Sequence, residues 1–400
     1  MTARSKIMQE ATRLTRAGRL GEAMAVLRGT LVPSAGPETG PARGSTAGQD
    51  GVVDMVPPSA ETGESWTPPR PDERAAATAG HPQARGALGG LLDRLWRPAT
   101  SIRPAARPSH AASRPAAAPI ADGARFEHHV YADQAGSRPY KLYIPSRRGQ
   151  PLPLVVMLHG CTQTPDDFAA GTRMNQLAEE QGFYVAYPAQ TRSANPSGCW
   201  NWFNTSDQQR DRGEPALIAG ITHQVMRDHP IDPRRVYVAG LSAGGAAAAI
   251  LGVTYPDLYA AIGVHSGLAC GAASDVASAF AAMRQGRTAA ADRFSFFVPT
   301  IVFHGDGDTT VNPVNGDQVM AQAEAAAESR TSVRRGTAPG GIGYTCTVRA
   351  DGCGCPMSEH WVLHGAGHAW SGGSPDGSYT EPRGPDASSE MLRFFLQQHK

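Results

Sequence analysis

The segment 236–245 constrains the fold of this chain more than any other. A short apolar run ends at Gly240, Ser242 follows two residues later, and small residues dominate the sequence after it. This pattern predicts a strand, a sharp turn and a helix, with G-x-S-x-G over residues 240–244. The glycines fit this geometry because a side chain at Gly240 or Gly244 would collide with the adjacent strand or helix. Ser242 is therefore a candidate nucleophile, although short glycine–serine patterns also occur in ordinary turns.

Composition and charge argue against several classes of protein. The chain has 37 basic and 36 acidic residues, a net charge of +1, so neither a nucleic-acid partner nor strong attraction to a membrane surface is indicated. No apolar run approaches the roughly 20 residues that a membrane-spanning helix needs. The pair Cys353 and Cys355 has no C-x-x-C partner or histidine at zinc-like spacing. We therefore expect a soluble protein without a metal, a cofactor or a transmembrane segment.

Composition also divides the chain into three parts. Residues 1–30 carry apolar residues at helical spacing on both sides of a short break, which predicts an N-terminal helical segment. Residues 31–124 are dominated by Pro, Ala, Gly, Ser and Arg, which predicts a disordered linker. Within it, the apolar segment 89–96 is either a stray hydrophobic patch or a site for a partner or polymer surface. Residues 125–400 are expected to form the packed domain.

The packed domain alternates predicted strands with predicted helices. Residues 126–131 and 140–144 read as an antiparallel pair at a sheet edge. The other expected strands are 154–158, 183–187, 236–239, 261–265, 300–303 and 360–363. Helices are expected at 165–180, 216–228, after Ser242, 276–283, 316–328 and 389–398. This order predicts the α/β class, with a mostly parallel, doubly wound sheet whose strands place their carboxyl ends at one edge.

The turn after the strand 154–158 is a candidate anion-binding turn. It has the sequence His159-Gly160-Cys161. Acyl transfer needs two backbone amides directed at the developing negative oxygen, and one such donor contributes a factor of about 10²–10³ in rate. A turn of this kind commonly supplies the second amide, so we expect the amide of Cys161 to act beside that of Ala243. The alternative is an ordinary glycine turn.

Two further strands are followed by an acid and a histidine. Asp306 and Asp308 follow the strand 300–303, and a carboxylate here can orient a histidine. We prefer Asp308, because it lies farther along the loop. His364 and His368 follow the last strand, and the glycine-rich run between them favours His368 as the base. The order Ser242, Asp308, His368 is the one expected of an α/β-hydrolase.

The loop 198–203 contains two tryptophans. Trp200 and Trp202 are costly in a solvated loop, whereas an aromatic platform suits a polymer or an aromatic acyl group. The alternative for one of them is that it caps the core. We hypothesise that Cys199, in the same loop, pairs with Cys161 and holds the loop beside the candidate anion-binding turn, which non-reducing peptide mapping can test.

From about residue 125 to its end, the chain resembles the poly(3-hydroxybutyrate) depolymerase-type esterases, within the α/β-hydrolases. Five segments carry the resemblance: 158–163, 199–203, 231–245, 303–308 and 365–373. Feruloyl and acetylxylan esterases share much of this pattern. The resemblance implies a nucleophile, an acid and a base at Ser242, Asp308 and His368, oxyanion amides at Cys161 and Ala243, and a substrate-contacting tryptophan in the loop of Trp200 and Trp202.

The resemblance implies a cofactor-free serine esterase that acts on hydroxyalkanoate polymers or oligomers. The alternatives are a feruloyl or acetylxylan esterase and, in a different class, a non-catalytic binding protein with an α/β-hydrolase fold. Members of this family are commonly secreted, which favours an extracellular protein. The chain has no recognisable signal peptide, which makes the cytoplasm the alternative. Residues 1–124 are candidates for tethering the enzyme to a granule or protein.

Overall fold

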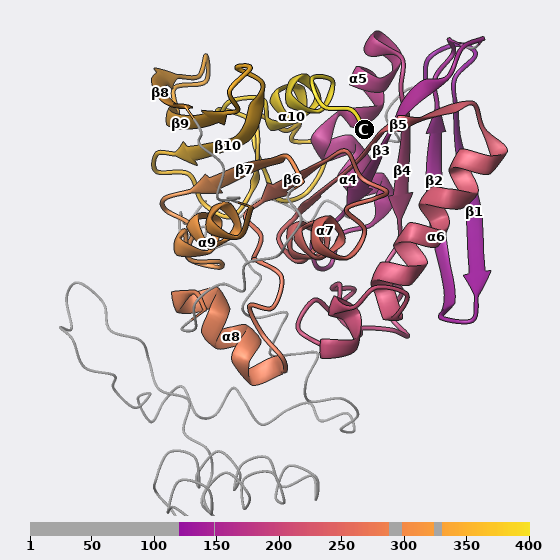
Figure 1. Ribbon diagram of the computed structural model, residues 1–400, viewed down its shortest axis with the longest axis horizontal. Helices are drawn as coiled ribbons and strands as arrows, with labels where there is room; N and C mark the ends of the chain where they lie inside the picture. The colour runs from indigo at the N-terminus through magenta and orange to yellow at the C-terminus, as the bar shows by residue number, and fades with distance from the viewer. Residues whose placement is uncertain (1–119, 148, 288–297, 324–329) are drawn as a thin grey trace, which may run out of the picture. The chain divides into compact units, whose positions relative to one another are not determined.

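The computed structural model describes residues 120–147, 149–287, 298–323 and 330–400 (Figure 1). The expectations for the helical segment 1–30, and for all of the linker 31–124 except its last five residues, lie outside the described residues. Among the described helices, none is long and apolar enough to cross a membrane.

The described residues form one large sheet in the order β1-β2-β4-β3-β5-β6-β7-β10-β9-β8. The inner strands from β4 to β10 are parallel, and antiparallel strands extend both edges. The strands are β1 Arg125–Asp133, β2 Gly136–Ile144, β3 Leu152–Leu158, β4 Tyr184–Pro188, β5 Ile231–Leu241, β6 Ala261–His265, β7 Thr300–Gly305, β8 Arg330–Thr337, β9 Gly343–Ala350 and β10 Pro356–Leu363. The predicted fold class is confirmed, and so is the antiparallel pair near residues 126–144.

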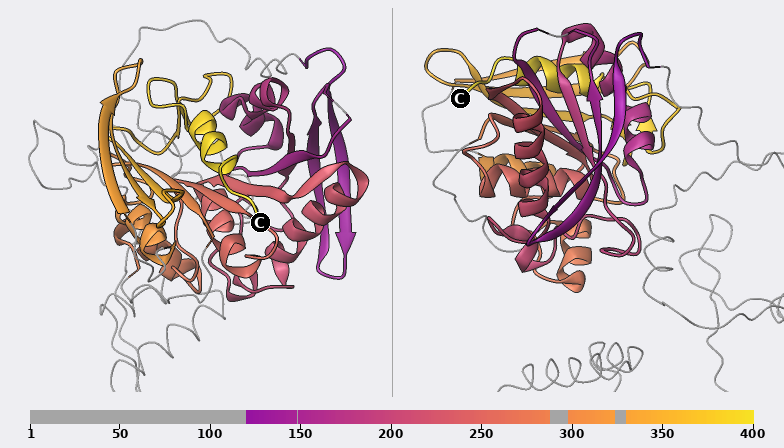
Figure 2. Two further views of the ribbon diagram at one scale, coloured as in Figure 1. Left: turned by 45° about the horizontal axis from the view of Figure 1, so that its top comes forward. Right: turned by 90° about the vertical axis from the view of Figure 1, so that its right-hand side faces the viewer.

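Helices cover both faces of this sheet (Figure 2). One face packs against α6 Gly213–Asp228, α7 Ala243–Thr254, α8 Val276–Gln285 and α9 Val314–Ala323. The other packs against α4 Pro165–Thr172, α5 Met174–Gln181 and α10 Ala387–Phe395. Strand β3 shows why both faces are apolar, because Val156 lies in one core and Val155 in the other. Shorter elements are the 3-10 helix η2 Thr205–Gln208 and the strand pair β11 Trp370–Ser371 and β12 Thr380–Glu381.

Two of the differences between the structure and the sequence prediction have a clear physical reason. The helix expected at 165–180 is two helices, because Arg173 takes a left-handed φ of 54° between them. The strands β8 and β9 were not predicted. Seven of the eight residues of β8 are exposed, so the strand has no alternating apolar face for a sequence pattern to detect.

Candidate active site

The turn between β5 and α7 holds Ser242 in a strained conformation. Its φ of 58° and ψ of −118° lie where non-glycine residues are rare. The Ser242 amide donates to the carbonyl of His265 on β6 (2.8 Å), and the Ser242 carbonyl accepts from the amide of Ala246 in α7 (2.9 Å). The neighbouring strand and the helix therefore fix the turn. The side chain of Ser242 is buried, and its Oγ has no hydrogen-bond partner among the described residues.

The glycines beside Ser242 allow this close packing. A Cβ built on Gly240 would lie 2.3 Å from the carbonyl carbon of Gly244, and one built on Gly244 would lie 2.1 Å from the carbonyl oxygen of Leu158. Both clashes involve backbone atoms, which cannot move away as a flexible side chain can. The steric requirement predicted from the sequence for Gly240 and Gly244 is confirmed.

Asp308 and His368 form a buried acid–histidine pair. His368 Nδ1 and Asp308 Oδ2 lie 2.7 Å apart, and the exposed fractions of the two side chains are 7% and 0%. Asp308 Oδ1 accepts from the amides of Thr310 and Val311, each at 2.9 Å. Burial raises the pKa of Asp308, but hydrogen bonds from His304 and His368 outweigh burial and leave the pKa well below its ordinary value. An ionised Asp308 keeps the proton of a neutral His368 on Nδ1, so that Nε2 is the basic nitrogen.

Asp306 and His364 form a second acid–histidine pair at the surface. His364 Nδ1 and Asp306 Oδ2 lie 2.9 Å apart, but the side chains are 47% and 43% exposed. The Nε2 of His364 is within hydrogen-bond distance of Thr345 Oγ1 (3.0 Å), so both ring nitrogens are engaged. Asp306 Oδ1 also accepts from the Gly365 amide (2.6 Å), so Asp306 stabilises the turn.

His265, at the end of β6, links the Ser242 turn to the loop that carries His368. Its carbonyl accepts from Ser242, and its Nε2 accepts from the amide of Ser371 (3.0 Å). Its ring stacks on Phe303 and Trp370. Burial lowers the pKa of His265 to about 3, so the ring is neutral at physiological pH. Sequence analysis missed His265, although its place at the end of a strand on the same sheet edge was a usable signal.

The candidate anion-binding turn lies beside the Ser242 turn, because β3 and β5 are neighbours with Leu158 in register with Gly240. The Gly160 amide donates to Gln163 Oε1 (2.9 Å), which fixes the turn internally. The hydrogen bonds of the described residues include no acceptor for the amides of Cys161 or Ala243. Two amide donors without a protein acceptor, on adjacent turns, are what an oxyanion site requires.

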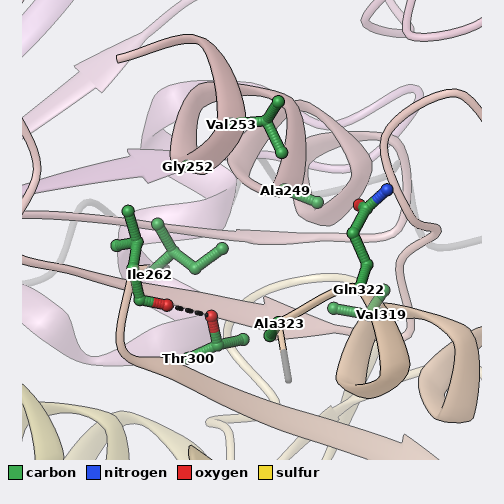
Figure 3. A pocket seen from close by; sticks show the side chains of 9 residues that line it. Ala249, Gly252, Val253, Ile262, Thr300, Val319, Gln322 and Ala323 are labelled. Carbon is green, nitrogen blue, oxygen red and sulfur yellow. Dashed lines mark hydrogen bonds between the residues drawn. The ribbon is translucent and has the colours of Figure 1, made fainter. Parts of the chain in front are cut away.

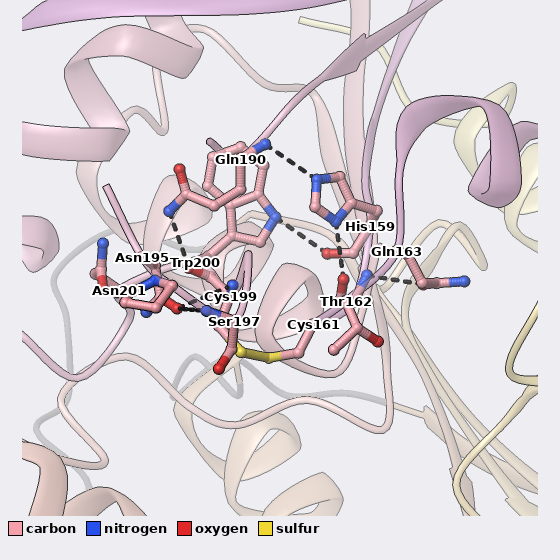
Figure 4. The surroundings of a disulfide bond; sticks show 12 residues. His159, Cys161, Thr162, Gln163, Gln190, Asn195, Ser197, Cys199, Trp200 and Asn201 are labelled. Carbon is pink, nitrogen blue, oxygen red and sulfur yellow. Dashed lines mark hydrogen bonds between the residues drawn. A yellow bond between two sulfur atoms is a disulfide. The ribbon is translucent and has the colours of Figure 1, made fainter. Parts of the chain in front are cut away.

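A disulfide joins Cys161 to Cys199 across a Cα–Cα distance of 4.2 Å, so the predicted pairing is present in the structure (Figure 4). Trp200 departs from its expected role. It is fully buried, and its indole Nε1 donates to the carbonyl of His159 (3.0 Å), so it caps the core and is not an exposed platform. Trp202 is 6% exposed and packs edge-on against Phe203, and its substrate contact stays a prediction.

Glu214 is a further residue that sequence analysis missed. It lies in the first turn of α6, is 5% exposed, and accepts hydrogen bonds from the loop that follows β4. Glutamate at a helix start is common and usually exposed, so no sequence signal separated it from ordinary first-turn acids.

Two other features lie away from these turns. An apolar pocket is lined by residues of α7, α9, β6 and β7 (Figure 3). Ile262 and Thr300 line it from the amino-terminal ends of β6 and β7, on the opposite edge from Ser242. Cys353 and Cys355 are exposed in the turn between β9 and β10, and their amides donate to Asp351. The described residues contain no cluster of three or more His, Cys, Asp or Glu side chains arranged to hold a metal.

The parallel sheet, the helices on both its faces and the serine turn after β5 define an α/β-hydrolase. The family described as Esterase PHB depolymerase matches residues 138–335, and the resemblance to this family predicted from the sequence is confirmed.

The comparisons with individual proteins agree with this placement. The chain is 33% identical over 238 residues to a poly(3-hydroxyalkanoate) depolymerase C of Paucimonas lemoignei, covering 56% of this chain and 57% of the relative. It is 29% identical over 199 residues to a feruloyl esterase B of Thermothelomyces thermophilus, covering 45% of this chain and 67% of that relative. The chain therefore spans about three fifths of the length of these relatives. An acetyl xylan esterase structure from Aspergillus awamori shares the fold, with a TM-score of 0.53, 20% identity, and coverage of 68% of this chain and 99% of that one.

We predict that Gly244→Ala destabilises the protein by about 2–3 kcal/mol, because the new methyl group meets the Leu158 carbonyl. Urea denaturation measures the change. Gly352→Ala is the matched control, since a Cβ there meets nothing within 4 Å, and its effect should stay within about 0.5 kcal/mol. Equal stability of the two variants would contradict the packing argument.

We predict a pH-dependent stability term from Glu214. Burial raises its pKa from 4.5 to about 7, so the folded protein keeps a proton that the unfolded chain releases between these pH values. Its contribution to the free energy of unfolding is therefore complete below about pH 4.5 and lost as pH rises to about 7. Relative to Glu214→Gln, the wild type should lose up to ~3 kcal/mol between pH 5 and pH 8 in urea denaturation.

Glu179→Gln is the control for this measurement. The largest influence on Glu179, burial, raises its pKa, but hydrogen bonds from Ser146 and Tyr143 outweigh burial and lower the pKa below 4.5. The stability difference between the wild type and this control should be flat over the same pH range. A flat difference for Glu214→Gln as well would show that Glu214 titrates normally.

Proposed function

We propose that the protein is a serine carboxylic ester hydrolase in which Ser242, His368 and Asp308 form the catalytic triad. The observation that carries the proposal is the buried 2.7 Å contact between His368 Nδ1 and Asp308 Oδ2, in a chain that matches an esterase family and has a strained serine turn at the same sheet edge. The depolymerase and esterase relatives support the same chemistry.

The proposed reaction has two half-reactions. In the first, Ser242 Oγ attacks the ester carbonyl carbon while His368 Nε2 takes the hydroxyl proton, and the carbonyl π electrons move onto oxygen. The amides of Cys161 and Ala243 stabilise this oxyanion. Collapse of the intermediate expels the alcohol, which takes the proton from His368. In the second, water attacks the acyl-enzyme carbonyl carbon while His368 Nε2 takes one of its protons, and the carbonyl π electrons again move onto oxygen. Collapse of this intermediate breaks the bond to Ser242 Oγ, which takes the proton from His368, and the carboxylic acid is released.

Asp308 has a supporting role in both half-reactions. Its carboxylate holds the Nδ1 proton of His368 and stabilises the imidazolium that forms when Nε2 is protonated. The low pKa of Asp308 fits this role, because the carboxylate stays charged while the imidazole gains and loses its proton.

We propose hydroxyalkanoate polymers or oligomers as the substrate class, because a poly(3-hydroxyalkanoate) depolymerase is among the relatives. Feruloyl or acetyl esters are the second candidate, since feruloyl and acetylxylan esterases match the chain as well. Hydrolysis rates on 3-hydroxybutyrate oligomers, methyl ferulate and acetylated xylan, measured with one preparation, would separate them. A kcat/KM at least tenfold higher for a feruloyl or acetyl ester would overturn the hydroxyalkanoate assignment.

We predict that Ser242→Ala abolishes hydrolysis of p-nitrophenyl butyrate while the circular dichroism spectrum stays unchanged, because the attacking oxygen is removed. Labelling by a fluorophosphonate should disappear with it. Undiminished turnover would refute the mechanism. A wild type that neither turns over esters nor takes the label would instead indicate a non-catalytic binding protein.

We predict opposite results for asparagine at the two acids. Asp308→Asn should lower kcat for p-nitrophenyl butyrate by about 10⁴, because the amide no longer holds the proton on His368 Nδ1. Asp306→Asn, which changes the exposed pair with His364, should leave kcat within a few-fold of the wild type. A larger loss from Asp306→Asn than from Asp308→Asn would exchange the two assignments.

A further inference from the structure

Glu214 is a buried carboxylate that the proposed chemistry does not use. Its side chain is 6% exposed, and its two oxygens accept four hydrogen bonds from three residues. The donors are the Asn201 amide (2.7 Å), Asn201 Nδ2 (2.8 Å), Gln190 Nε2, and Nη2 of Arg138 (3.4 Å). Because four hydrogen bonds converge on one buried carboxylate, they fix the positions of the segments that donate them.

Two of the three donor residues, Gln190 and Asn201, belong to the loop that follows β4, and this loop is bonded to the candidate anion-binding turn. Gln190 Nε2 also donates to the carbonyl of Cys199 (2.9 Å), and the Gln190 amide donates to His159 Nε2 (3.0 Å). Cys199 is joined to Cys161 by the disulfide (Figure 4). Glu214 is thus connected to residues 159–161 by a hydrogen bond through Gln190 and by a covalent bond through Cys199.

The hydrogen-bond network of Glu214 needs the ionised form of its carboxyl group. Arg138 on β2, 10% exposed on its side chain, is the positive neighbour. Asp207 in η2 is the negative neighbour, and its Oδ1 accepts from the Glu214 amide (2.8 Å). A protonated carboxyl would turn one acceptor oxygen into a donor facing N–H groups that can only donate, so protonation breaks part of the network.

We propose that Glu214 is a positioning residue for the esterase reaction, holding the loop 190–201 so that the disulfide places the Cys161 amide at the oxyanion. This inference rests on the proposed function. Glu214 acts through other residues and does not touch the ester. Its role is to keep one oxyanion donor within the short distance at which the donor is effective.

The experiment compares Glu214→Gln with the wild type across pH. Glutamine keeps the size of the side chain but cannot accept all four hydrogen bonds, so kcat for p-nitrophenyl butyrate should fall about tenfold at pH 8.5. This is less than the factor of about 10²–10³ expected from losing a donor outright. At pH 5.5 the wild-type carboxyl is itself largely protonated, so the wild-type-to-variant ratio of kcat should shrink towards 1. A merely structural role would leave the ratio constant.

The matched control is Glu179→Gln. Glu179 also accepts several hydrogen bonds, from Tyr143 and Ser146, but it lies beyond the carboxyl end of β2, at the opposite edge of the sheet from Ser242. The ratio of the wild-type kcat to the kcat of Glu179→Gln should stay near 1 at both pH values. If Glu214→Gln does not fold, Asn201→Ala is the second variant. It keeps the backbone donor, removes Nδ2 together with the Oδ1 that accepts from Asn195, and should still lower kcat several-fold at pH 8.5. A wild-type kcat in that variant overturns the proposal.

A double-mutant cycle tests the path through the disulfide. In a Cys161→Ser/Cys199→Ser background, Glu214→Gln should lower kcat at pH 8.5 by only about twofold, because the covalent link to the turn is already cut. An undiminished tenfold loss there, or a kcat ratio that does not change with pH in the native background, would refute the positioning role. Fluorophosphonate labelling of the wild type separates this failure from failure of the proposed function, since the label tests Ser242 itself.

Discussion

The contact between the start of α7 and the ends of β3 and β5 is the constraint on which the site depends. Gly240 and Gly244 let backbone meet backbone, and the space that they leave would not admit even a methyl group. The helix can therefore begin directly at the sheet edge, with its first amides beside the turn after β3. Strain at Ser242 is the cost, and the hydrogen bonds to His265 and Ala246 on either side maintain it.

Two buried carboxylates show how neighbours decide the protonation state. Burial alone would raise the pKa of both Asp308 and Glu214. Asp308 receives hydrogen bonds from two histidines and two backbone amides, and these favour its charged form. Glu214 also receives several hydrogen bonds. The negative charge of Asp207 nearby adds to the effect of burial, so the pKa of Glu214 is raised to about 7. Between pH 5 and pH 8, Asp308 therefore stays ionised while Glu214 loses its proton.

The sequence predicted the parts of the fold and site that leave a local pattern. Apolar runs located the inner strands, and the motifs after them located Ser242, Asp308 and His368 at one edge. Properties that depend on distant residues were not predictable. Trp200 is buried because a loop folds over it, and β8 is a strand because β9 lies beside it. His265 and Glu214 are important because of their contacts with residues distant in the sequence, and a local pattern does not reveal such contacts.

The strand β8 also affects the tendency of the protein to self-associate. A sheet that ends in an open strand offers unpaired amides and carbonyls, to which the same strand of a second molecule can bind. Here the last strand is almost wholly exposed and carries Arg330, Arg334 and Arg335. Two such edges would bring like charges together, which opposes edge-to-edge pairing. The arginines thus oppose growth of the sheet into aggregates, while Arg334 also packs over the buried Trp361 ring and pairs with Glu390.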